Sequence, residues 1–165
     1  MRISPETHPI VNCLGPGAAS ATGDSGDSVN LEGYAGALII IKHVGTNSDA
    51  MTFTVHEGAT ATVAKTGTYP LAAESGSTSG GEFKIWVNTS PSSTDALVKQ
   101  TDGVSYTVAS TTQIVVFYVS SSCLTQGRSW INVGFDAGHA SNFVCITYIL
   151  DGGRYQQTTP PTAIA

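Results

Sequence analysis

Alternation of apolar and polar residues, repeated along the whole chain, constrains the possible folds more than any other feature of this sequence. Met51, Phe53 and Val55 occupy one phase of such a pattern, and Thr52 and Thr54 occupy the other. Successive side chains of a β-strand point to opposite sides of a sheet, so the pattern predicts strands with one buried and one wet face. A helical period is hardly present. We therefore expect an all-β protein.

The alternating and apolar runs are separated by turns rich in glycine, serine and aspartate, such as residues 23–27, 45–49 and 136–138. Strands are expected at residues 9–14, 37–41, 51–57, 61–65, 83–88, 104–109, 114–119, 129–135 and 142–150. Short strands at this spacing predict a two-sheet antiparallel β-sandwich or jelly roll. The runs 37–41 and 114–119 are apolar in both phases, which is typical of strands covered on both sides or facing a partner.

The chain of 165 residues is of single-domain size and can bury a core without disulfide staples. We expect a sandwich domain over residues 17–155, with extended arms at residues 1–16 and 156–165 because prolines disfavour helix there. Such arms are either frayed termini or straps that dock on a partner.

Charge and composition argue against several classes of protein. Only 12% of the residues are charged, and seven Lys and Arg residues with a net charge of −5 provide no basic stripe for nucleic acid. No apolar stretch approaches the roughly 20 residues that span a bilayer, and residues 1–6 lack the apolar region of a secretory signal. We expect no membrane partner and synthesis in a cytoplasm. There Cys13, Cys123 and Cys145 stay reduced, and the apolar run around Cys145 predicts a buried thiol.

The motifs that carry chemistry are weak. The string Gly-Asp-Ser-Gly around Ser25 resembles the nucleophile segment of trypsin-like proteases, but only His8 precedes it and a flexible turn has the same composition. His43, His56 and His139 lack metal-ligand spacing, and the position of His56 predicts a solvated side chain. No nucleotide-binding loop and no pair of strand carboxylates is evident. We expect no catalytic residue, no cofactor and no metal, and hence a protein that is not an enzyme.

Two tryptophans leave a binding function open. Trp86 lies on the polar phase of its strand, and Trp130 lies opposite the phase of Ile131, Val133 and Phe135. Outward aromatic rings could form a platform for sugars, or each could fill a gap in a sheet or subunit interface. The alternative function is therefore a carbohydrate- or receptor-binding sandwich.

Two stretches of the chain resemble small virion proteins of tailed bacteriophages, of the head decoration or cement type. The first runs from Leu-Glu-Gly-Tyr at residues 31–34 through residues 37–41 to Met-Thr-Phe-Thr-Val-His-Glu at residues 51–57. The second joins Trp-Ile-Asn-Val at residues 130–133 to residues 144–150 and Gly-Arg-Tyr at residues 153–155. The family usually has a shorter middle, so residues 74–110 depart from its pattern and suggest an insertion.

The resemblance implies a protein made in a host bacterial cytoplasm and placed on the capsid exterior of a virion, where it binds the major capsid protein and stabilises the head, commonly as a homotrimer. For the alternative function, the resemblance implies a carbohydrate- or receptor-binding sandwich of a phage tail or fibre. The doubly apolar strand at residues 114–119 is the candidate subunit interface, since a monomer rarely leaves such a face bare. The proline-bearing arms are the candidate straps. The candidate partner-binding residues are Pro5, His8, Pro9, Ile114, Val116, Tyr118, Pro160 and Pro161.

Overall fold

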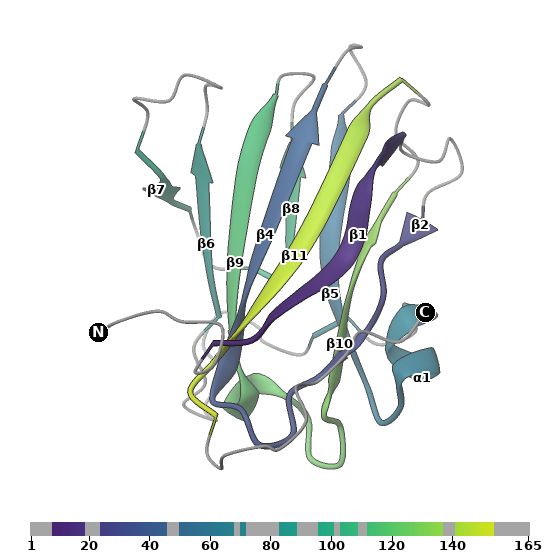
Figure 1. Cartoon of the computed structure of the whole chain (residues 1–165), viewed down its shortest axis with the longest axis vertical. Coiled ribbons are helices and arrows are strands. Elements are labelled where there is room, and N and C mark those ends of the chain that lie inside the picture. The colour runs from purple at the N-terminus through teal and green to yellow at the C-terminus, as the bar shows by residue number, and fades with distance from the viewer. Residues whose placement is uncertain are drawn as a thin grey trace.

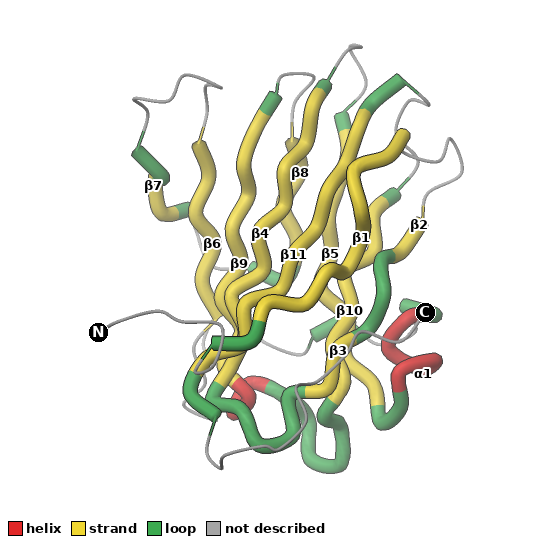
Figure 2. Tube along the Cα trace, in the orientation of Figure 1, coloured by secondary structure: helices red, strands yellow, loops and turns green. Residues whose placement is uncertain are grey.

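Two antiparallel β-sheets packed face to face make up the computed structural model, which describes residues 8–18, 24–45, 50–67, 70–71, 83–88, 96–100, 103–108, 112–136 and 141–153. Figure 1 shows one sheet in front of the other, and Figure 2 shows that strands dominate the described chain. The all-β antiparallel sandwich predicted from the alternation is confirmed, whereas the jelly roll remains a prediction. No helix in the described ranges is long and apolar enough to cross a membrane.

The larger sheet has six strands. In spatial order they are β1 (Ile10–Ala18), β11 (Phe143–Asp151), β4 (Gly36–Val44), β9 (Gln113–Ser120), β6 (Phe83–Asn88) and β7 (Val98–Lys99). The smaller sheet has five, namely β2 (Asp24–Ser25), β10 (Trp130–Phe135), β5 (Met51–Gly58) and β8 (Ser105–Val108) in order, with β3 (Val29–Asn30) also paired to β10. Every strand pair is antiparallel, as expected when neighbouring strands are not joined by helical crossovers.

One phase of each strand forms the core between the sheets. Ile39 of β4 and Phe117 of β9 face inward from the larger sheet, and Phe53 and Val133 face inward from the smaller one, all with no exposed surface. His43 also points inward, where its ring meets that of Phe53 edge-on at 6.3 Å between centroids. The period-two pattern thus assigned the buried faces correctly.

A helix replaces the strand predicted at residues 61–65. Helix α1 (Ala61–Lys65) begins after Thr60, whose hydroxyl accepts a hydrogen bond from the Val63 N–H at 3.3 Å and caps the first turn. Ala61 and Ala64 also fit the spacing of a helix. Five residues are too few to distinguish the helical period of 3.6 from the strand period of two. Gly58 lets the helix approach β5, because a Cβ there would collide with the Ala64 backbone. The strand prediction for this segment was wrong for that reason.

Three segments have a different role from the one that the sequence suggests. Residues 10–16 of the predicted N-terminal arm, which include most of the strand expected at residues 9–14, belong to β1 and pair with β11 of the larger sheet. Residues 24–25, predicted as part of a turn, form the short edge strand β2. The described parts of residues 74–110 supply β6, β7 and β8, so they belong to the two sheets rather than to an appended unit.

A buried carboxylate anchors the chain between the 3-10 turn η1 (Ser121–Cys123) and β10. Glu57 at the end of β5 has no exposed surface. It accepts hydrogen bonds from the Thr125 N–H at 2.9 Å, the Thr125 hydroxyl at 2.5 Å and the Arg128 guanidinium at 2.7 Å. Three donors on one carboxylate satisfy the charge that burial would otherwise penalise.

Candidate functional site

The outer faces of the two sheets differ in chemistry. In the smaller sheet the outward phase carries Thr52, Thr54 and His56 from β5, and α1 packs on β5 and β10. In the larger sheet the outward phase of β4 begins with Leu38 and Ile40. Antiparallel sheets usually present polar residues to water on their free side, so the larger sheet is the exception here.

The apolar face is defined by three rows of outward residues across neighbouring strands of the larger sheet. They run Ile10, Ile149, Leu38, Tyr118 and Lys84 in the first row, Asn12, Thr147, Ile40, Val116, Trp86 and Lys99 in the second, and Cys145, Lys42, Ile114 and Asn88 in the third, with Phe143 beyond them on β11. Apolar residues thus predominate on β11, β4 and β9, whereas the flanking strands are more polar. Ile10 is 58% exposed and Phe143 is 48% exposed. These strands face the viewer in Figure 1.

The size of the apolar face is close to that of a protein interface. Five strands spaced about 4.8 Å apart span about 24 Å, and nine residues of strand extend about 30 Å, which gives an area of about 700 Å². A standard interface buries about 800 Å² on each partner. The face is therefore large enough for a specific association.

Several predicted binding residues meet on this face. Ile114, Val116 and Tyr118 all point outward from β9, and Val116 lies between Ile40 and Trp86 of the flanking strands. These neighbours leave Val116 only 6% exposed, whereas Ile114 and Tyr118 are half-buried. The sequence predicted the doubly apolar runs at residues 37–41 and 114–119, which lie in β4 and β9, but not the contribution of β11.

The other predicted binding residues are dispersed. His8 is buried, with Nε2 at 3.5 Å from Asp151 Oδ1, and the Pro9 carbonyl accepts a hydrogen bond from the Leu150 N–H. Both residues are therefore held by β11 of their own domain. Pro5, Pro160 and Pro161 lie outside the described residues.

The two tryptophans do not form one platform. Trp86 belongs to the larger sheet and Trp130 to the smaller one, and both are half-buried. A sugar platform built from both rings is incompatible with this arrangement.

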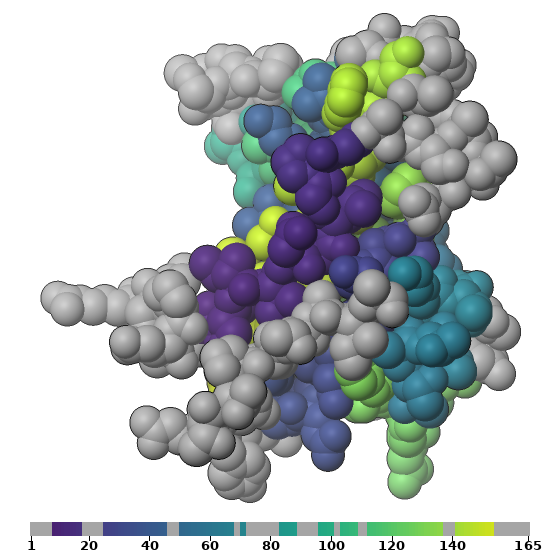
Figure 3. Space-filling model, turned by 45° about the vertical axis from the view of Figure 1, so that its right-hand side comes forward, coloured from purple at the N-terminus to yellow at the C-terminus, as the bar shows by residue number. Residues whose placement is uncertain are grey.

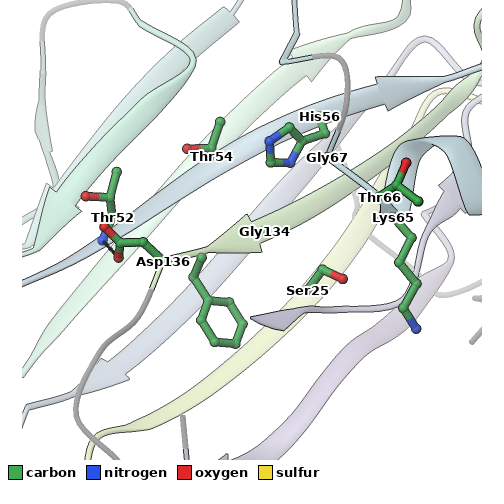
Figure 4. A pocket seen from close by; sticks show the side chains of 10 residues that line it. Ser25, Thr52, Thr54, His56, Lys65, Thr66, Gly67, Gly134 and Asp136 are labelled. Atoms are coloured by element: carbon green, nitrogen blue, oxygen red, sulfur yellow. Dashed lines mark hydrogen bonds between the residues drawn. The ribbon is translucent and has the colours of Figure 1, made fainter. Parts of the chain in front are cut away.

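A polar pocket lies on the outer face of the smaller sheet. It encloses about 500 Å³, and its floor is formed by Thr52, Thr54 and His56 of β5. Gly134 of β10 lies beside this row, and Ser25 of β2 lies beyond Gly134. Figure 4 shows these side chains around the hollow.

The end of α1 closes one side of the pocket, where Lys65, Thr66 and Gly67 contribute to the lining. Gly67 has φ +66° and packs over the imidazole of His56, so that a Cβ there would come within 3.4 Å of the ring. Figure 3 shows the teal surface of the α1 region next to the indigo surface of the segment that carries β2 and β3. The helix thus turns a flat sheet face into a recess.

Two ionisable groups in the pocket have defined environments. Burial lowers the pKa of His56, because desolvation disfavours the imidazolium. The prediction that His56 is simply solvated was therefore wrong, since the ring is half-buried under Gly67. Asp136 Oδ1 accepts a hydrogen bond from the Thr52 N–H at 2.6 Å.

Ser25, His56 and Asp136 line the same pocket, but they do not form a catalytic triad. The pairing of Ser25 with Gly134, and of Gly134 with Thr54, puts β2 two strand spacings, about 10 Å, from β5. Within the described chain no hydrogen bond joins Ser25 to His56, and His56 Nδ1 has no partner that would orient it as a base. Serine, histidine and carboxylate are present without the required connections.

The described residues contain no group of three or more His, Cys, Asp or Glu side chains that could hold a metal ion. His43 lies in the core and His56 lies on an outer face, so these two do not meet. Cys145 is half-buried and points outward from β11, contrary to the expected buried thiol, because it falls in the outward phase of that strand.

Fold and surfaces together define an all-β sandwich with one apolar and one polar outer face. Comparison of the chain with protein-family models, with curated proteins and with solved structures finds no match. The evidence for function therefore comes from the residues of the two faces.

Proposed function

We propose that this chain is a non-enzymatic structural protein that assembles with other proteins through the apolar face of its larger sheet. Within that class we propose a capsid decoration or cement protein on the exterior of a tailed-phage virion, bound to the major capsid protein. The apolar face is the observation that carries the proposal. Contiguous apolar patches of several hundred Å² on soluble proteins are commonly interaction sites.

A lattice-bound role does not require high affinity in a single contact. An area of about 700 Å² per partner does not itself fix the affinity of that contact. Many copies on a regular shell convert moderate affinity into tight binding, because each engaged contact raises the effective concentration of the next. The family resemblance of residues 31–57 and 130–155 supports the same role.

Self-association, with a homotrimer favoured, is proposed as the alternative occupant of this face. A face lined by Leu38, Ile40 and Ile114 is stabilised when another apolar surface removes it from water. Sedimentation at micromolar concentration should report a mass above that of the monomer. A monomer at that concentration would remove self-association from the proposal and leave the capsid protein as the partner.

Quantitative mass spectrometry of purified particles of the virus that encodes the chain tests the proposal. Copies in the hundreds per particle support a capsid decoration protein. A dozen copies or fewer would replace that role with one in the neck, tail or fibre, and absence from the particle would refute the virion role.

Paired variants test the face itself. Phe143→Asp introduces a charge at an exposed position of the apolar face, and Ser105→Asp introduces the same charge at an exposed position of the smaller sheet. We expect Phe143→Asp to reduce binding to shells that lack the protein by about tenfold or more, because the carboxylate would be desolvated in the contact. Ser105→Asp should bind normally. Equal binding by both variants would refute the assignment of the face.

A further inference from the structure

We propose that the pocket on the smaller sheet is a binding site for a neutral saccharide. It is formed by β5, the end of α1, β2 and β10, which are brought together only in the folded sandwich. A recess of about 500 Å³ is within the usual range for small-molecule sites. The proposal concerns a different sheet from the apolar face and does not depend on the assembly role.

The lining favours a ligand with many hydroxyl groups. Ser25 and Thr54 contribute hydroxyl groups, which can both donate and accept hydrogen bonds. His56 adds a ring that is neutral at neutral pH because its pKa is lowered, and a neutral imidazole has one donor and one acceptor nitrogen. Sugar hydroxyls have the same dual capacity.

The charged groups of the lining are engaged by the protein. Lys65 Nζ lies 3.8 Å from Asp27 Oδ1, and in Figure 4 its side chain runs away from Thr54 and His56. The Asp136 carboxylate accepts the Thr52 N–H. With one cation and one anion each held at the margin, the pocket has no excess charge that would select a phosphate or an ammonium ligand.

The shape of the floor also suits a sugar ring. Gly134 places backbone where other residues would put a side chain, next to the hydroxyl row of β5. Phe135 also borders the recess, but it is only 6% exposed and its ring packs on that of Phe53 in the core, with 5.9 Å between centroids. The contacts offered to a sugar therefore come from the polar groups of the lining.

The test is a chemical-shift titration of the full chain with neutral sugars at millimolar concentration, using glucose, galactose and N-acetylglucosamine, with inorganic phosphate as the charged probe. We expect saturable shifts at Thr54, His56 and Gly134 with at least one sugar and none with phosphate. Thr54→Val should weaken that binding by about tenfold, the loss of one hydrogen bond.

Thr147→Val makes the same substitution at an outward position of the larger sheet and should bind like the unaltered chain. Thermal unfolding of both variants establishes that they are folded. The proposal is overturned if none of the sugars shifts the pocket residues, if phosphate binds there instead, if the shifts centre on Trp86, or if folded Thr54→Val binds unchanged.

Discussion

Replacing Arg128 by methionine tests the account of the buried Glu57 carboxylate. The Glu57 side chain is fully buried, whereas that of Arg128 is 24% exposed, and the two are joined at 2.7 Å. Arg128→Met keeps the long apolar stem and removes the cation. A carboxylate without exposure then depends on the two Thr125 donors alone.

Breaking a buried ion pair from one side typically costs 3–5 kcal/mol, because a charge is left uncompensated. The two Thr125 hydrogen bonds remain, so we expect the lower end, about 3 kcal/mol of unfolding free energy. For a chain of this length that lowers the melting temperature by about 6–12 °C. Adding Glu57→Gln removes the stranded charge, and the double variant should recover about 1–2 kcal/mol relative to Arg128→Met.

Urea unfolding, monitored by tryptophan fluorescence, measures this cycle for the unaltered chain, Arg128→Met, Glu57→Gln and the double variant. The recovery is the diagnostic feature, because two independent losses would add instead of offsetting each other. A cost below about 1 kcal/mol for Arg128→Met, or a double variant less stable than Arg128→Met, would refute the role given to the buried carboxylate.

Three further predictions follow from single sites. Burial raises the pKa of Cys13 to about 12, so iodoacetamide at pH 8 should label Cys145 and leave Cys13 unmodified in the native protein, as peptide mass spectrometry can check. The pKa of His56 is lowered in the folded protein, so the unfolded chain takes up a proton at this residue at a higher pH than the folded protein does. The free energy of unfolding should therefore decline as the pH falls below about 6.5. His56→Gln should flatten that decline in thermal scans across pH. Gly58→Ala should destabilise the protein by about 1–3 kcal/mol in urea, since its Cβ would collide with the Ala64 backbone; unchanged stability would contradict that close approach.

The sequence predicts those elements of the fold whose pattern is contained within a single continuous segment. Strand β5 was predictable because its eight residues display a period of two, and β4 was predictable because its short apolar run is bounded by turn residues. The two-residue strands β2, β3 and β7 are too short to carry any period, and they form because a neighbouring strand offers free backbone groups. Helix α1 was missed because its five residues fit both periods.

The apolar face and the polar pocket also differ in how much of each can be predicted from the sequence. Ile114 and Tyr118 were visible as a doubly apolar run, so part of the apolar face could be predicted. The pocket draws Ser25, Thr54 and Gly134 from distant parts of the chain, and only the strand pairing brings them together. A glycine within an otherwise bulky strand was the one local signal of that recess.

The unlike outer faces also predict how the protein sits on a particle. If the apolar face lies against the capsid, the outward thiol of Cys145 is covered in the assembled state, while the polar sheet with its pocket points to solvent. Iodoacetamide labelling of Cys145 should then be at least about tenfold slower on particles than in the free protein, because the thiol must first be released from the contact. Ser105→Cys in a Cys145→Ser background provides the matched probe on the opposite sheet and should react equally fast in both states. Slowing at position 105 with unchanged labelling at position 145 would mean that the polar face is the docked one and that the proposed orientation is reversed.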